Sequence, residues 1–366
     1  TIGVFQIESA AQMQTVTRLR PRNLTEMAWE VGAVRPGVGV NDGVTLLIRR
    51  HMGKDPDWKF DHPLEEPALG RTYGVPLYQD QLGELAMHVG GMSAVEGDQM
   101  RRAFTRRNNE RHIAHWKDKF ITGALSKGVP LDAAEKVFGK FHGMYQFPEA
   151  HAFAFGVTAY QMSWIKHYWP LEFFVGLFNN QPMGFYNLET LKEDAVRHGV
   201  KVLGPDVNRS SRKAIIENGA LRMGLTHVAK LRAATAAPIL EARDESGDFS
   251  SLADFMMRTG TQQEVLDYLS AAGALDHFDE IADPDRDPPR VADRRHLRWE
   301  SGLRYRSRGE KKDGSRQLAF EMPVEQDMVA LPAESGWDRM IGEYSATGVY
   351  PEGHLMAKIR PHLPST

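Results

Sequence analysis

Apolar residues recur along most of the chain at the three- and four-residue spacing of an α-helix. In residues 78–89, for example, Leu82, Leu85, Ala86 and Val89 share one helical face. The same spacing predicts helices over residues 24–31, 98–119 and 188–198, and several more between 219 and 276. Capping boxes support helix starts at residues 93–96 and 261–264, and Ser251 is predicted to cap another helix. The pattern therefore predicts a mainly α fold.

Two segments depart from plain helical periodicity. Residues 182–216 predict a small α/β insert, in which a helix over 188–198 ends at Gly199 and a short strand follows over 200–203. Residues 219–276 repeat a helix, a tight turn and a helix, which is how a helix-hairpin-helix unit presents backbone N–H groups to nucleic-acid phosphates. Many small helical bundles share that pattern, so both interpretations stay open.

Residues 131–180 are rich in aromatic side chains, and this density favours a buried core. His151, Tyr160 and Lys166 are candidates for an exposed side of a helix that opens near Pro148. A His or Tyr at such an opening can stack on a base or contact a phosphate. No second histidine stands at the spacing of a zinc-binding helix, so His151 does not predict a metal site.

The composition narrows the class of protein. The 366 residues are 42% apolar and contain no cysteine, which excludes disulfide scaffolds, cysteine nucleophiles and thiolate zinc sites. The length predicts two or three domains of ~150 residues. With no long apolar run, a soluble cytosolic protein is the default expectation, and an opening without Met suggests a fragment.

The formal net charge is −3, yet two segments are locally basic. Residues 98–119 hold seven basic and three acidic residues, and 286–316 hold eleven and five. Arg102 and Arg106 are four apart, as are Arg107 and Arg111, and like charges at that spacing repel unless an anion lies opposite. A polyphosphate or DNA-backbone site and an ordinary solvated helix face both fit. The second segment predicts a basic linker.

Two other candidate sites are weaker. The loop at residues 35–39 has glycines that can present N–H groups to an anion, but no P-loop sequence follows, so a plain turn fits as well. Asp283, Asp285 and Asp287 lie among prolines rather than on rigid strands, so we do not expect them to bind metal.

Several ordered segments resemble the bacterial C-family DNA polymerases, the alpha subunits of DNA polymerase III. They are GVFQIES (3–9), RPG (35–37), GVPLYQDQ (74–81), DQMRRAF (98–104), FPEAHA (147–152) and YSATG (344–348). The segments NNQPMGFY (179–186) and RHGV (197–200) look most like the error-prone paralogue used in damage-induced mutagenesis.

The resemblance implies a helical fingers region with a small α/β insert (1–205), a helix-hairpin-helix DNA-binding region (206–278), and a basic linker (279–366) toward an absent OB-fold. It implies DNA-directed DNA polymerase activity in translesion or repair synthesis. The Mg²⁺ ligands and catalytic carboxylates would lie in a palm outside these residues, so this fragment alone would be inactive. The implied partners are a DNA primer-template, dNTP, a sliding clamp and accessory mutagenesis proteins, with no membrane.

By the same resemblance, Arg101 and Arg102 face the dNTP triphosphate. The further nucleotide contacts are Arg35, His151, and Arg106 and Arg107, which stand where the family usually has Lys. Lys166, Lys230 and Arg232 are the DNA-binding candidates. The family's hairpin glycines are missing from KLRAA (230–234), which puts DNA binding by this hairpin in doubt. The alternative is a non-catalytic DNA-binding or partner-binding protein of the same descent. A freestanding nucleotide hydrolase is disfavoured, because the chain lacks a P-loop and a metal-binding carboxylate set.

Overall fold

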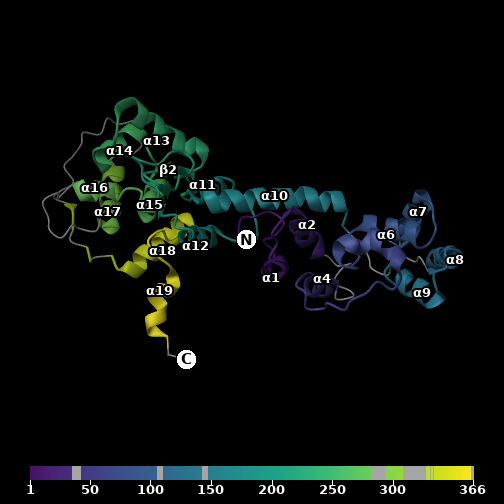
Figure 1. Cartoon of the computed structure of the whole chain (residues 1–366). Helices are drawn as coiled ribbons and strands as arrows, with labels where there is room; N and C mark the ends of the chain where they lie inside the picture. The colour runs from purple at the N-terminus through teal and green to yellow at the C-terminus, as the bar shows by residue number, and fades with distance from the viewer. Residues whose placement is uncertain are drawn as a thin grey trace. The chain divides into compact units, whose positions relative to one another are not determined.

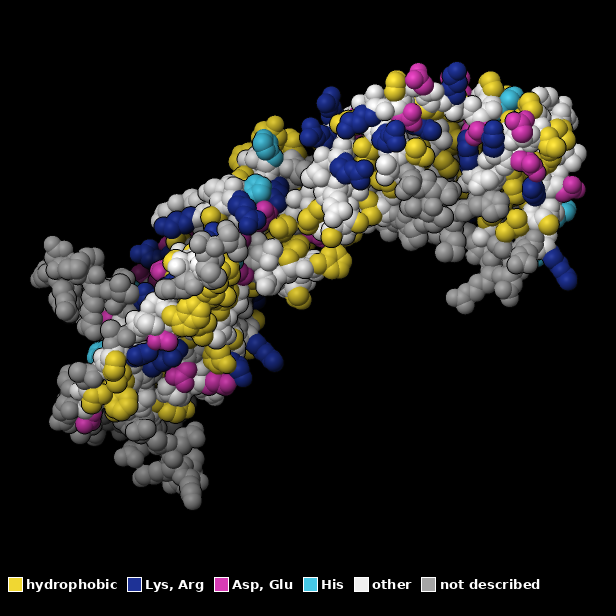
Figure 2. Space-filling view, turned by 90° about the horizontal axis from the view of Figure 1, so that it is seen from below, with side chains coloured by type: hydrophobic (Ala, Val, Ile, Leu, Met, Phe, Trp, Pro, Cys, Tyr) yellow, Lys and Arg dark blue, Asp and Glu magenta, His cyan; other side chains and the backbone are white. Residues whose placement is uncertain are grey.

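The computed structural model describes residues 1–34, 43–104, 110–141, 147–281, 293–307, 327–329, 331–332 and 334–363 (Figure 1). These residues form a mainly α structure with one small sheet, as predicted. Two compact units divide the chain, unit 1 over 1–165 and unit 2 over 166–366. None of the described helices is long and apolar enough to cross a membrane. Lys and Arg side chains are interspersed with Asp and Glu on the face drawn in Figure 2.

Unit 1 is built from helices. They are α1 (Ala10–Leu19), α2 (Leu24–Ala33), α4 (Gly43–His51), α5 (Glu66–Leu69), α6 (Gln79–His88), α7 (Ala94–Phe104), α8 (Glu110–Ser126), α9 (Leu131–Gly139) and most of α10 (Glu149–Tyr168). Helix α6 packs on α7, and α8 packs on α9, around buried side chains such as Leu85, Phe120 and Phe138. The predicted capping box before α7 is confirmed, because the Glu96 carboxylate accepts from the Ser93 N–H at 2.8 Å.

The long helix α10 buries its small residues and exposes its aromatic ones. Ala152, Gly156 and Ala159 are buried. A β-carbon at Gly156 would lie 3.2 Å from the backbone nitrogen of Ala28 on α2, so the two helices approach closely there. Tyr160 and Trp164 on the other side of α10 are 49% and 46% exposed. The prediction of a buried aromatic core is therefore wrong for this helix, because close helix packing selects small side chains.

A carboxyl group lies in the interior of unit 1. Glu30, on α2, is fully buried, and neither of its carboxylate oxygens has a hydrogen-bond partner among the described residues. Burial raises the pKa of Glu30 to about 8, because an ionised carboxylate there would lose its hydration without gaining a partner. Sequence patterns did not single out this residue.

Unit 2 contains α11 (Pro170–Asn179) and α12 (Leu188–Arg197). Helix α12 confirms the predicted helix over 188–198. The sheet has the order β1-β3-β2, with β1 (Val202–Leu203) parallel and β2 (Ile215–Glu217) antiparallel to β3 (Ala220–Arg222). Strand β1 matches the predicted strand. Strand β3 was not expected, because it lies in the segment 219–276 that the sequence pattern predicts to be helical.

The rest of unit 2 is helical. It contains α13 (Ala233–Ser246), α14 (Leu252–Thr259), α15 (Gln263–Ala271), α16 (His277–Ile281), α17 (Arg294–Ser307), α18 (Gly336–Thr347) and α19 (Leu355–Ile359). Both α17 and α18 pack on α15, so parts of residues 279–366 fold onto the helical core around Phe255 and Leu269. The limits 1–205, 206–278 and 279–366 remain a prediction.

Two helix starts in unit 2 test the cap predictions. Ser251 caps α14 by accepting from the Asp254 N–H at 3.1 Å, as predicted. The box predicted at residues 261–264 is wrong, because Gln262 occupies the cap position of α15 and makes no side-chain cap bond. The Thr261 hydroxyl instead lies 2.6 Å from that of Thr259.

Candidate functional site

Arg101 and Arg102 lie in the last turn of α7 and share one carboxylate. Asp98, one turn earlier, accepts from Nη2 of Arg101 at 2.7 Å and lies 2.8 Å from Nε of Arg102. The hydrogen bond from Arg101 holds the pKa of Asp98 below its usual range. The Arg101 side chain is 27% exposed and that of Arg102 is 67% exposed. The pair therefore presents two oriented cations at the surface of unit 1.

Arg101 is also tied to α6. Its Nη1 donates to Oε1 of Gln79 at 3.3 Å. The start of α6 is held firmly, because Oε1 of Gln81 accepts from the N–H groups of Leu77 and Tyr78 at 2.8 and 2.9 Å. The amide of Gln81 donates in turn to the Thr72 hydroxyl at 2.7 Å. Arg101 is therefore tied, through the half-buried Gln79, to a helix start that a buried network holds in place.

The start of α10 is fastened to the same region. The Gln79 N–H donates to the carbonyl oxygen of Phe147 at 3.1 Å, and Oδ2 of Asp80 accepts from the Glu149 N–H at 2.7 Å. The Asp80 carboxylate on α6 thus caps α10, because it accepts a hydrogen bond from a free N–H group of its first turn. Arg71 bridges the carboxylates of Glu84 and Glu149, with a contact of 2.8 Å to each.

His151 is exposed on the first turn of α10, between two aromatic rings. Its ring centroid lies 4.8 Å from that of Phe147 and 4.3 Å from that of Phe155. Contacts through Gln79 and Phe147 connect it to Arg101. The structure therefore joins His151 and the two arginines of α7 into one network.

The remaining predicted nucleotide contacts cannot be located. Arg35, Arg106 and Arg107 lie outside the described residues. Sequence patterns missed the supporting roles of Gln79 and Asp80, although both stand in the family segment GVPLYQDQ. No local sequence signal announces that Asp80 caps a helix 69 residues later.

Lys166 does not occupy the exposed position that was predicted for it. Its side chain is 7% exposed, and its Nζ lies 2.5 Å from Oδ2 of Asp194 on α12. The ammonium also lies 5.7 and 5.5 Å from the ring centroids of Phe173 and Phe174 on α11. Lys166 is thus used in packing within unit 2, and we leave it out of the proposed DNA-binding set.

The candidate hairpin precedes α13 in unit 2, and both of its predicted contact residues are exposed. Lys230 adopts a left-handed backbone with φ of 69°, the conformation that a glycine would supply most easily. Its Nζ lies 2.9 Å from Oε1 of Glu264, and this bond raises the pKa of Lys230. Arg232 directly precedes α13, where the first N–H groups of a helix favour an anion. The Ala229 N–H is used internally, by donation to the Ala346 carbonyl at 2.7 Å.

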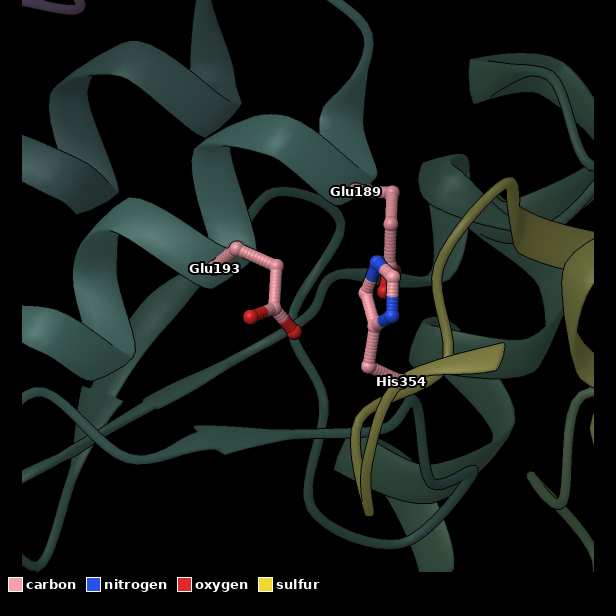
Figure 3. Close-up of side chains that lie close together, drawn as sticks. All are labelled: Glu189, Glu193 and His354. Atoms are coloured by element: carbon pink, nitrogen blue, oxygen red, sulfur yellow. The ribbon is translucent and has the colours of Figure 1, made fainter. Parts of the chain in front are cut away.

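One group of potential metal ligands is found among the described residues. Glu189, Glu193 and His354 lie close together (Figure 3). The buried Lys192 lies among them, with Nζ 2.8 Å from Oε1 of Glu189 and 2.5 Å from Oε1 of Glu193. Its ammonium offsets one of the two carboxylate charges, and Nδ1 of His354 already accepts from the Met356 N–H at 3.0 Å. These residues do not fit Mg²⁺, which prefers an open set of oxygen ligands.

Comparison with known proteins gives two family matches. Residues 1–128 match the bacterial DNA polymerase III alpha subunit finger domain, and residues 199–283 match the helix-hairpin-helix motif. Arg101 and Arg102 lie in the first match, and Lys230 and Arg232 lie in the second.

Curated relatives that bear the name error-prone DNA polymerase match along 99% of the chain. One from Anaeromyxobacter sp. (strain K) is 37% identical, one from Nocardia farcinica (strain IFM 10152) 36%, and one from Dechloromonas aromatica (strain RCB) 33%. The chain covers 31%, 31% and 34% of their lengths, about a third in each case. The likeness runs through both matched regions, so the chain is similar to the finger and helix-hairpin-helix parts of bacterial DNA polymerase III alpha subunits, and most of all to relatives that bear the name error-prone DNA polymerase.

Proposed function

We propose that this chain supplies the dNTP and primer-template contacts of an error-prone DNA polymerase that acts in translesion or repair synthesis. The names of the relatives support this assignment. The chain spans about a third of their length, and the catalytic carboxylates with their Mg²⁺ ions would come from the remainder. The part played by the described residues is therefore to bind and orient phosphates.

The arrangement of Arg101 and Arg102 carries the proposal. In nucleotide transfer, the primer 3′-oxygen bonds to the α-phosphorus of the dNTP while the bond to pyrophosphate breaks, so negative charge develops on the leaving group. A guanidinium that is already oriented stabilises this charge without having to reorganise. Asp98 and Gln79 orient Arg101 in this way, and the exposed Arg102 can reach an incoming phosphate.

Other residues complete the proposed interface. We assign His151 to the same nucleotide site, because its ring is exposed and contacts connect it to Arg101. Arg35, Arg106 and Arg107 are further candidates by resemblance alone. A sliding clamp and accessory mutagenesis proteins are proposed as partners on the same ground.

The test compares arginine variants in the longer polymerase of which we propose this chain is a part. R101A and R102A should each lower the efficiency of single-nucleotide incorporation about tenfold or more, because each removes a hydrogen bond to a charged group. Primer-template affinity should change less than twofold. R18A is the matched control, since Arg18 is an exposed arginine in the last turn of α1, outside the basic segment. Equal losses of incorporation and of primer-template affinity would contradict the assignment.

The exposed hairpin supports DNA-backbone binding in unit 2. Lys230 and Arg232 both lie just before the start of α13, and the left-handed backbone at Lys230 provides the turn without a glycine. DNA affinity of the 366-residue chain should therefore fall steeply as salt rises, because phosphate contacts release counterions. A K230A/R232A variant should show a smaller salt dependence. If only this binding is found and R101A and R102A leave incorporation intact, the non-catalytic DNA-binding alternative is preferred.

A further inference from the structure

A surface pocket lies among α15, α17 and α18 of unit 2. Its volume is about 540 Å³, within the range of small-ligand sites. Asp267, Tyr268, Arg298 and Ser345 contribute polar groups to its lining. Small residues, including Gly342 and Ala346 on α18, leave the space open.

Arg298 is distinct among the arginines of α17 that the structure describes with their side chains. Arg294 is paired with Asp276 at 2.7 Å, Arg295 with Asp338 at 2.9 Å, and Arg304 with Glu300 at 2.7 Å. The Arg298 guanidinium makes no hydrogen bond or ion pair within the described part of the chain, and its Nε is buried. Buried donors are normally satisfied, so this one points to a missing acceptor.

The pocket adjoins the hairpin. Ala346, in its lining, accepts the hydrogen bond from the Ala229 N–H at 2.7 Å. Glu264, the ion-pair partner of Lys230, lies one turn before Asp267 and Tyr268 on α15. Lys230 and the pocket that holds Arg298 therefore both contact the same short stretch of α15, between Glu264 and Tyr268.

We propose that Arg298 binds a phosphate group of a DNA strand whose neighbouring phosphates are held at the hairpin, an inference that rests on the DNA binding proposed above. A guanidinium offers five N–H donors that match phosphate oxygens, and the hydroxyls of Tyr268 and Ser345 add donors to the same pocket. Asp267 is the opposing charge, and its Oδ1 accepts from the Gln263 amide at 3.1 Å. The remaining negative charge of Asp267 weakens phosphate binding, so the proposal predicts that removing this charge tightens DNA binding.

The experiment measures fluorescence anisotropy of a labelled single-stranded oligonucleotide and a labelled duplex with the 366-residue chain at several salt concentrations. R298Q should weaken binding about tenfold at low salt, the loss expected for one hydrogen-bonded charge contact. It should also reduce the slope of log K against log salt by about 0.9 for the duplex and about 0.7 for the single strand. D267N should tighten binding, because it removes the repelling carboxylate.

The matched control is R304Q, which removes one positive charge from the same helix at an arginine outside the pocket lining. R304Q should change affinity less than twofold, and equal losses for R298Q and R304Q would overturn the proposal. R298K keeps the charge and should retain the salt slope. Circular dichroism of each variant verifies that it folds.

Two further arms separate the sources of the phosphate and the two proposals. If the wild type binds free dNTP in a way that R298Q abolishes, while DNA binding is unchanged, the DNA assignment is overturned. A pocket for an acidic peptide would also leave DNA binding unchanged in R298Q. If K230A/R232A weakens DNA binding and R298Q does not, the pocket proposal fails while the DNA-binding proposal stands. If none of these variants weakens DNA binding, both the pocket proposal and the DNA-binding proposal fail.

Discussion

Replacing Glu30 by Gln tests whether an unpartnered carboxyl group limits the stability of unit 1. Glu30 is fully buried without a hydrogen-bond partner among the described residues, and its pKa is raised from 4.5 to about 8. The folded protein therefore keeps a proton that the unfolded chain releases above pH 4.5. This contribution to stability is complete below pH 4.5 and is lost as the pH rises toward 8.

The shift sets the size of the effect. At 1.36 kcal/mol per pKa unit, the shift corresponds to a loss of about 5 kcal/mol between pH 4.5 and pH 8. This is an upper limit, because an ionised carboxylate lets water approach and so recovers part of its hydration. Gln has the same shape and releases no proton. E30Q should therefore be close to the wild type in stability at pH 5 and more stable at pH 8, by up to several kcal/mol.

The assay is urea unfolding between pH 5 and pH 8, followed by proteolysis and mass spectrometry of peptides that cover α2. A peptide-level readout is needed because two units need not unfold together. E66Q is the control, since Glu66 on α5 is exposed and should leave the pH dependence unchanged. Parallel pH profiles for the wild type and E30Q would refute the reasoning.

Four other substitutions test the packing. G156A should destabilise unit 1 by about 1–3 kcal/mol, because its β-carbon would lie 3.2 Å from the Ala28 nitrogen. G176A meets open space and should stabilise α11 by about 0.5–1 kcal/mol. Thermal unfolding compares the two variants, and a change of the same sign in both would be inconsistent with the close approach at Gly156. K230G should raise stability by about 1 kcal/mol by removing a left-handed lysine while weakening DNA binding in anisotropy; unchanged stability would argue against backbone strain. K166M should lower the free energy of unfolding in urea by about 3 kcal/mol, because it leaves the buried Asp194 without its lysine. It should change DNA affinity less than twofold. A DNA-binding defect without a loss of stability would restore Lys166 to the DNA interface.

Local signals in the sequence predicted much of the helical structure. The helix over 188–198 ends one residue from the observed α12, and Ser93 and Ser251 cap the helices they were expected to cap. Such features depend on residues within one or two turns of each other. Hydrophobic periodicity could not orient α10, because its small and its aromatic faces are both apolar. The buried face was decided by the space available beside Ala28.

The sequence predicted the candidate site only where its charged residues lie close together along the chain. Arg101 and Arg102 were found from the basic segment and the family resemblance, and Asp98 lies within one turn of both. Lys166 was misplaced because its partner Asp194 is 28 residues away and on another helix. Arg298 has no acidic partner among the described residues, and no sequence signal indicated this either. Arg294 and Arg295 pair with acids from other segments, which come close to α17 only in the folded unit.

The fastening of α10 has a consequence for synthesis of the chain on the ribosome. Glu149 is synthesised 78 residues after its partner Arg71 and 69 residues after its partner Asp80. At typical translation speeds, roughly 4 to 16 seconds separate Arg71 from its second carboxylate. During that interval the face of α2 around Ala28, which packs closely on Gly156 in the folded unit, lacks its partner helix until α10 has been made.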